Sequence, residues 1–243
     1  KSLLQLGIGG TAVGTGINTH PQFKARVVQK MREYAGLNFS VAADSVLTTW
    51  SAADFLDASN SLRILAAEII KICNDLMLLS SGPKTAIAEL VLPEVEPGSS
   101  IMPGKVNPSI PECAIMVCYQ VLGNDYAVAE AAKSGQLELN VMTPLIAFDL
   151  LWSIKLMTNA LKMLKDCCIS GIKVDVERTS ELLQKGLSLV TALNPYIGYE
   201  VAAEIVKLAL KHNKSITQVI LENKVIAADD LKKILNAEAM TEP

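Results

Sequence analysis

The stretch from residue 44 to residue 80 contains neither glycine nor proline. Within it, apolar side chains recur at alternating spacings of four and three residues: Ala58, Leu62, Leu65, Ile69, Ile72, Leu76 and Leu79. This heptad pattern is typical of a helix that packs against other helices. A second apolar row, formed by Ala66, Ile70, Cys73 and Met77, runs beside it, so a wide apolar face is expected. A helix of this length spans about 50 Å and cannot bury its apolar face by itself. The stretch therefore predicts a bundle of long helices.

Two further long helices are expected along the chain. Ser109 and Glu112 form a capping-box pattern with an early Pro111, which predicts a helix that begins there and ends near Gly135. Its apolar positions are Ile110, Cys113, Val117, Val121, Val128 and Ala132. A third helix is expected from Thr143 to about Cys168, with inward positions at Met142, Ile146, Leu150, Met157, Leu161 and Leu164. A shorter helix is expected from Pro21 to about Ala35, because Gly36 would end it.

The segments become shorter after Gly171. Helices are expected at residues 175–187, 198–211, 215–223 and 228–235. The predicted fold is therefore all-α, with a long-helix bundle followed by a small helical domain. We place the bundle at residues 1–170 and the small C-terminal domain at residues 171–243.

The composition narrows the function classes. Half of the 243 residues are hydrophobic and only 19% are charged, which predicts apolar surface for a partner. The formal net charge is −3 and no Lys/Arg cluster is present, so nucleic-acid binding is not expected. The uncharged stretch at residues 2–23 contains too many glycines and polar residues for a membrane span, and no signal peptide is recognisable.

The cysteines and histidines argue against a metal site. Five cysteines is an odd number, and they show no CxxC spacing. This pattern fits a reduced, cytoplasmic compartment better than a disulfide framework or a zinc site. His20 and His212 lie far apart and beside no acidic cluster, so no metal site is expected.

The loop at residues 96–108 is the place where chemistry is expected. It reads EPGSSIMPGKVNP and offers Ser99, Ser100, Lys105 and Asn107 just before a predicted helix. Backbone N–H groups, a helix start and one cation together make an anion site of carboxylate size. The positive electrostatic field of such a site stabilises the ionised form of a serine, so Ser99 and Ser100 are both candidates for a base or nucleophile. The alternative is that both serines are turn and cap residues.

A second glycine-rich loop at residues 7–16 is expected to be structural. It contains no lysine for a phosphate-binding P-loop, and Ala12 stands where a dinucleotide fingerprint needs its third glycine. A tight turn near a site is the favoured interpretation. Likewise, the polar residues of segment 135–140 are expected to cap the helices on either side.

Several motifs together resemble the aspartase/fumarase superfamily. They are GSSIMPGKVNP at 98–108, GGTAVGTGIN at 9–18, KICNDLMLLSSGP at 71–83, GQLELNVMTP at 135–144 and TALNPYIGYE at 191–200. The resemblance spans essentially the whole chain. Within the superfamily, PGKVNP is similar to aspartases (aspartate ammonia-lyases) and class II fumarases. Gln136-Leu137 resembles aspartases, whereas Glu96-Pro97-Gly98 resembles fumarases, so both remain open with aspartase preferred.

The resemblance implies an activity and its residues. Ser99 would be the general base that removes a proton beside a carboxylate of L-aspartate, which gives fumarate and ammonia. Lys105, Asn107 and Ser100 would bind the dicarboxylate, and Glu96, Gly98 and Gly104 would support the loop. No metal or cofactor is implied.

The resemblance also implies a larger assembly. Superfamily members are homotetramers whose sites are shared between subunits, and they carry an N-terminal domain with further site segments. The chain, which starts at Lys1, is expected to be the C-terminal part of such a subunit and to be inactive alone. A hypothesis of another class is that the polypeptide is a non-catalytic helical oligomerisation module.

Overall fold

A computed structural model describes residues 2–241 of the chain, and Lys1, Glu242 and Pro243 lie outside the described residues. The described residues form two compact units. The first contains residues up to 80 and residues 92–172. The second contains residues 173–241 together with residues 81–91, a segment that the sequence assigned to the bundle. The predicted all-α class is confirmed, because the strands are only two residues long.

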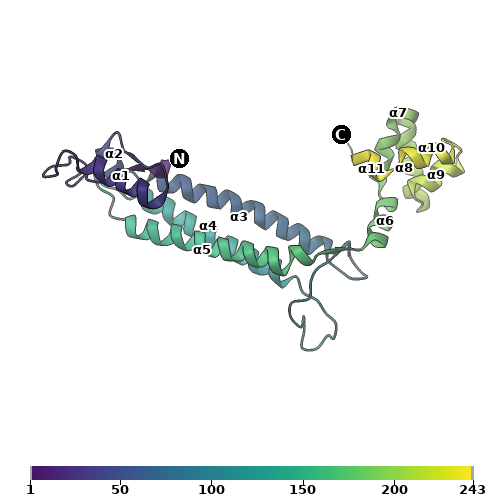
Figure 1. Cartoon of the computed structure of the whole chain (residues 1–243). Coiled ribbons are helices and arrows are strands. Elements are labelled where there is room, and N and C mark those ends of the chain that lie inside the picture. Colours follow the sequence, from purple (N-terminus) through teal and green to yellow (C-terminus); the bar gives the residue numbers. More distant parts are fainter. Residues whose placement is uncertain (1, 242–243) are drawn as a thin grey trace. The chain divides into compact units, whose positions relative to one another are not determined.

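Three long helices build the first unit. They are α3 (Ala53–Leu79), α4 (Ser109–Lys133) and α5 (Thr143–Cys167). The three run side by side, with α4 antiparallel to both neighbours (Figure 1). The expected bundle and the ends of the second and third helices are therefore confirmed to within a residue or two.

The first long helix is interrupted, which the sequence did not predict. A short helix α2 (Ser45–Trp50) precedes α3, and Ser51 between them is extended. The Asp44 carboxylate caps α2 by accepting from the N–H groups of Val46 and Leu47. The Ser51 hydroxyl then accepts from Ala53 N–H at the start of α3. Polar side chains thus accept from backbone N–H groups at the start of α2 and at the start of α3. These hydrogen bonds favour a break between the two helices.

The buried face of α3 is rotated from the heptad row toward the second apolar row that the sequence also predicted. Its buried residues are Ser59, Ala66 and Cys73, of which Ala66 and Cys73 belong to that second row. Leu65 is 38% exposed and Ile72 43% exposed. The α4 face is rotated similarly: Val121 and Val128 are buried as expected, whereas Ala114, Ile115 and Cys118 take the places expected for Cys113 and Val117. The apolar side chains of α3 and α4 that face away from the bundle core thus remain partly or fully exposed.

The core of the bundle is mostly apolar, with one buried polar level. One apolar cluster contains Cys73, Leu92, Ala114, Ile115, Leu164 and Cys168, and a second contains Ala66, Cys118, Val121 and Met157. A third contains Ala52, Val128, Ala131 and Ile146. Along α4, buried polar side chains lie between the second and third clusters. Ser59 Oγ donates to Asp125 Oδ1 at 2.6 Å, and Asn124 Nδ2 donates to Ser153 Oγ at 3.0 Å.

The remaining elements of the first unit are short. η1 (Ser2–Leu4), β1 (Gln5–Leu6), α1 (Phe23–Ala35) and β2 (Ser40–Val41) precede α2 in the chain, and η2 (Ile169–Gly171) follows the end of α5. β1 and β2 pair in parallel, Gln5 opposite Ser40. Gly36 ends α1 in the left-handed conformation (φ 65°), as the sequence predicted.

The second unit has its own small core. Its helices are α6 (Val176–Lys185), η3 (Leu187–Leu193), α7 (Asn194–Ile197), α8 (Tyr199–His212), α9 (Ile216–Glu222), α10 (Ala228–Ile234) and α11 (Ala237–Thr241). The buried core consists of Leu193, Ile205, Ala209, Ile216, Val219, Ile220 and Leu231. β3 (Leu90–Val91) pairs antiparallel with β4 (Lys173–Val174). The Arg178 guanidinium donates to the carbonyls of Ala86 and Ile87, which holds residues 81–91 in this unit.

Candidate functional site

The loop that precedes α4 is anchored at its base and exposed beyond it. Leu92 is buried in the bundle core, and Pro93 packs so closely on Gly171 that a Cβ there would lie 2.6 Å from the proline ring. From Glu94 to Val106 almost every residue is exposed, with Ile101 at 84%. The loop with the predicted catalytic residues is therefore an accessible, irregular segment held by a packed base.

Gly98 forms a narrow neck in this loop. Its N–H donates to the Lys105 carbonyl at 3.1 Å, and its carbonyl accepts from Asn107 Nδ2 at 2.7 Å. A Cβ on Gly98 would lie 2.1 Å from the Lys105 carbonyl oxygen, so only glycine fits. Gly104 supplies the left-handed conformation (φ 75°) on the opposite side of the loop. These contacts close residues 98–105 into a small loop.

Ser99 lies directly after the neck and is half-buried. Its Oγ accepts hydrogen bonds from Ile101 N–H and Met102 N–H, both at 3.2 Å. Donors that point at an oxygen favour its negatively charged form. Ser100 is exposed and follows at once. Of the two serines that the sequence left open, Ser99 is therefore the one whose oxygen accepts backbone N–H groups, an arrangement that the alternative interpretation as a turn residue also predicts.

The charged groups of the loop are Lys105 and Glu96. Lys105 is exposed, and no carboxylate within residues 2–241 lies at ion-pair distance from its ammonium group. Glu96 accepts a hydrogen bond from the Ser109 hydroxyl. Glu112 is also exposed and lies in the first turn of α4, beside the loop in sequence. It is an ionisable group that the sequence treated only as a cap partner.

The capping box expected at Ser109 and Glu112 is not formed. The N-cap of α4 is Pro108, whose ring offers no side-chain cap, and the Ser109 hydroxyl bonds to Glu96 instead. The sequence pattern placed the start of the helix one residue too late. Ser109 is the first residue of α4, and Pro108 occupies the N-cap position. The N–H groups of the first turn of α4 accordingly have no side-chain acceptor, which suits an anion.

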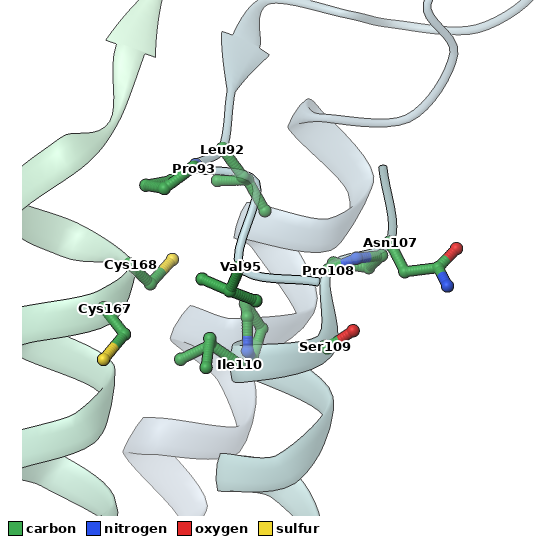
Figure 2. Close-up of a pocket in the computed structure, with 10 residues that line it drawn as sticks. Leu92, Pro93, Val95, Asn107, Pro108, Ser109, Ile110, Cys167 and Cys168 are labelled. Carbon is green, nitrogen blue, oxygen red and sulfur yellow. The ribbon is translucent and has the colours of Figure 1, made fainter. Parts of the chain in front are cut away.

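A shallow pocket lies at the base of the loop. Both ends of the loop and the end of α5 line it: Leu92, Pro93, Val95, Asn107, Pro108, Ser109, Ile110, Pro111, Cys167 and Cys168. Figure 2 shows Asn107 and Ser109 pointing away from the two cysteines. The apolar lining indicates that this pocket supports the loop from below.

The glycine-rich loop at residues 7–16 packs against α2. A Cβ on Gly14 would lie 2.4 Å from the backbone of Val46, and one on Gly7 would lie 2.4 Å from the Thr48 hydroxyl. Thr11 and Val13 adopt left-handed conformations with φ of 47° and 48°. These close approaches explain the glycines and support the interpretation as a tight structural turn.

The segment between α4 and α5 is a cap, as expected. Buried Asn140 donates to the carbonyl of Ala131 at 3.1 Å and accepts from Met142 N–H at 2.9 Å. Leu137, which the sequence used to distinguish two enzyme classes, is 88% exposed with φ of 48°. Its exposure leaves it available for contacts outside the described residues.

The remaining candidates give no second site. All five cysteines are free thiols, and burial raises the pKa of Cys73 to about 11, with Cys118 and Cys168 nearby adding to the rise. His20 is exposed, and its Nδ1 accepts from Gln22 N–H. No group of three or more potential metal ligands occurs in the described part of the chain. None of the helices formed by residues 2–241 has the length and apolarity to cross a membrane.

Comparison with known proteins places the chain in a family. The sequence profile of a family described as "Lyase" matches residues 1–123, and one described as "Fumarase C C-terminus" matches residues 189–242. The chain therefore belongs to the lyase family of the aspartase/fumarase superfamily, as its motifs predicted.

Named relatives fall into the two expected classes. Aspartate ammonia-lyase of Pseudomonas aeruginosa is 46% identical over 99% of the chain, and that of Helicobacter pylori is 43% identical over 98%. A class II fumarate hydratase of Pseudomonas aeruginosa is also 46% identical over 99%. The chain spans about half the length of the curated relatives it matches.

Solved structures show the same fold. A fumarate lyase/delta crystallin protein from Brucella melitensis superposes with a TM-score of 0.92 at 41% identity, covering 99% of this chain and 52% of that one. A class II fumarase from Schistosoma mansoni superposes with a TM-score of 0.90 at 35% identity, covering 96% and 52%.

Proposed function

We propose that the full-length protein is a carbon–nitrogen lyase that converts L-aspartate to fumarate and ammonia without a metal or organic cofactor. The observation that carries the proposal is the Ser99 hydroxyl, whose oxygen accepts two backbone N–H groups in an exposed loop that also bears Lys105. The aspartate ammonia-lyases among the relatives support the choice of substrate.

In the proposed reaction, Ser99 acts as the general base. Its ionised oxygen takes a proton from the carbon next to one substrate carboxylate, and the electron pair moves into that carboxylate. The dianionic intermediate then expels the protonated amino group of the adjacent carbon as ammonia, which leaves fumarate and a proton on the Ser99 oxygen. Serine is a very weak acid, so the N–H groups of Ile101 and Met102 have the task of stabilising its anion.

The same loop supplies groups for the dicarboxylate. Lys105 offers a full positive charge and Ser100 a hydroxyl, and the N–H groups of Ser109 and Ile110 lie at the start of α4. One amide hydrogen of Asn107 already donates to the Gly98 carbonyl. Its second amide hydrogen and its Oδ1 are the groups that would contact substrate. Gly98, Gly104 and Glu96 support the loop and do not contact substrate in this proposal.

A homotetramer in the cytoplasm, with sites shared between subunits, completes the proposal. Large apolar side chains are exposed along the bundle: Ile64, Leu65 and Ile72 on α3, Met116 and Tyr126 on α4, and Phe148 and Leu151 on α5. Such a surface needs a partner, and a second copy with the same apolar rows is complementary to it. Five free thiols are consistent with a reducing compartment.

Fumarate hydratase is the second candidate. It is favoured by the 46% identical class II fumarase and by Glu96 at the start of the loop. The same serine base would act, with hydroxide rather than an amine leaving from malate. The two reactions share fumarate and differ only in the leaving group, so the loop geometry serves either.

An absorbance assay for fumarate separates the candidates. The full-length protein is incubated with L-aspartate and, separately, with L-malate. Fumarate from aspartate supports the proposal, whereas fumarate from malate alone assigns the second candidate. Activity of the 243-residue chain by itself would contradict a site shared with other segments. Inactivity of the full-length protein on both substrates would favour the non-catalytic oligomerisation module.

A further inference from the structure

The hydroxyl of Ser109 joins the two ends of the Ser99 loop. Ser109 is the first residue of α4, and its Oγ donates to Glu96 Oε1, thirteen residues earlier in the chain. The second contact across the loop is that of Asn107 with the Gly98 carbonyl at 2.7 Å. With the bond from Gly98 N–H to the Lys105 carbonyl, three hydrogen bonds therefore join the two ends of the loop.

The Ser109 hydroxyl has no role in capping α4. Pro108 is the N-cap, and no side-chain cap bond forms at this helix start. A serine at the first helical position with its hydroxyl directed to a loop carboxylate contributes nothing to the helix that alanine could not provide. The bond to Glu96 is thus an addition to the loop rather than a by-product of helix formation.

We propose that Ser109 is a positioning residue. Its hydrogen bond to Glu96, called the latch below, holds the neck of the loop closed and so keeps Ser99 and Lys105 in position for the reaction. This inference rests on the proposed function, because it deepens the account of the same loop. Figure 2 shows Ser109 and Asn107 on the same side of the pocket, away from Cys167 and Cys168. The latch therefore acts on the open side of the loop, where the packed base does not restrain it.

Loss of the latch should loosen the loop without unfolding the bundle. The base remains fixed by buried Leu92 and by Pro93 against Gly171. Two hydrogen bonds would then hold the neck: the one from Gly98 N–H to the Lys105 carbonyl, at 3.1 Å, and the one from Asn107 to the Gly98 carbonyl. Residues 99–105 would sample open conformations more often, which lowers the fraction of molecules with Ser99 in place.

Limited proteolysis with trypsin measures that opening directly. Lys105 lies in the exposed loop, and cleavage after it reports the open population when reclosing is fast. In the full-length protein, we expect Ser109→Ala to raise the cleavage rate after Lys105 roughly three- to tenfold. Cleavage after Lys84, in segment 81–91, serves as the internal reference and should not change. Ser134→Ala, at the other end of α4, is the matched control, because its hydroxyl bonds only to the Glu130 carbonyl.

The activity of the same variants gives a second readout. Ser109→Ala should lower kcat by a smaller factor than cleavage rises, because kcat follows the closed fraction of the loop and cleavage follows the open fraction. The thermal midpoint should not change, and Ser109→Thr should restore kcat because it keeps the hydroxyl. Glu96→Ala should match Ser109→Ala. The double variant should be no worse than either single one, because both remove the same bond.

The outcomes distinguish the latch from the proposed function. Unchanged cleavage after Lys105 in Ser109→Ala would overturn the latch, whatever the activity. Additive losses in the double variant would also overturn it. Faster cleavage in a protein that turns over neither aspartate nor malate would support the latch and refute the proposed function.

Discussion

Substitution of Gly98 by alanine tests the neck of the loop most directly. The added Cβ would lie 2.1 Å from the Lys105 carbonyl oxygen and 2.6 Å from its carbon. Reaching ordinary van der Waals separation requires a displacement of roughly 1 Å or more. That displacement removes the 3.1 Å bond from Gly98 N–H to Lys105 O and disturbs the 2.7 Å bond from Asn107.

The magnitude follows from those two bonds. At about 1 kcal/mol each, their loss disfavours the closed neck by about 2 kcal/mol. Because about 1.4 kcal/mol corresponds to a factor of ten, kcat/KM for fumarate formation should fall roughly 30-fold in Gly98→Ala. The free energy of unfolding should change by less than about 1 kcal/mol, since the loop is exposed and relaxes locally.

The assay is fumarate absorbance with L-aspartate and the full-length protein, paired with a urea titration. Gly36→Ala is the control for steric contact: Gly36, unlike Gly98, has a left-handed conformation (φ 65°), but no atom lies within 4 Å of an added Cβ. It should cost about 1 kcal/mol of stability and leave kcat/KM unchanged. If Gly98→Ala kept kcat/KM within threefold of wild type, the neck would not position Ser99 and the reasoning would fail.

Three further predictions concern other groups. Ser99→Ala should lower kcat by at least about 100-fold in the fumarate assay with folding intact, because a general base is lost; a loss below tenfold would place the base elsewhere. Burial raises the pKa of the Asp149 carboxyl, whose Oδ2 has no hydrogen-bond partner within residues 2–241. The native state therefore holds this proton more tightly than the unfolded state. The contribution of Asp149 to the free energy of unfolding should be complete below about pH 4 and decline as the pH rises through the raised value. Urea titrations of wild type and Asp149→Asn between about pH 4 and 7 check this, and identical pH dependence would contradict it. A thiol reagent followed by mass spectrometry should label exposed Cys167 quickly and buried Cys73 slowly, because burial raises the pKa of Cys73 to about 11; equal rates would show that the core opens readily.

Much of the fold was predictable because periodicity and punctuation act locally. Glycines and prolines marked the ends of the helices, and Gly36 ends α1 as expected. The break at Ser51 was not predictable from the absence of glycine and proline, because it depends on side-chain caps from Asp44 and Ser51. The rotation of the α3 face was also hidden, since the helix carries apolar residues over a wide arc and only its neighbours select the buried part.

The candidate loop was predictable in its residues but not in its internal contacts. Ser99, Lys105 and Asn107 could be selected because serine, lysine and amide side chains between glycines are typical of an anion site. The sequence nevertheless placed Ser109 in a capping box, whereas the hydroxyl bonds to Glu96. It also gave no sign of the buried Ser59–Asp125 and Asn124–Ser153 pairs, because polar residues in a helix usually face solvent.

The sequence by itself determined the class of fold, the family and the loop in which chemistry is expected, because these depend on residue types and their spacing along the chain. Only the tertiary structure decided which serine oxygen the backbone stabilises and which hydroxyl ties the loop closed. It also decided which side of each long helix stays exposed. The two loop contacts join groups two to thirteen residues apart, and the backbone path of the loop selects them. The exposed sides of the helices depend on residues far apart in the sequence, which meet only after folding.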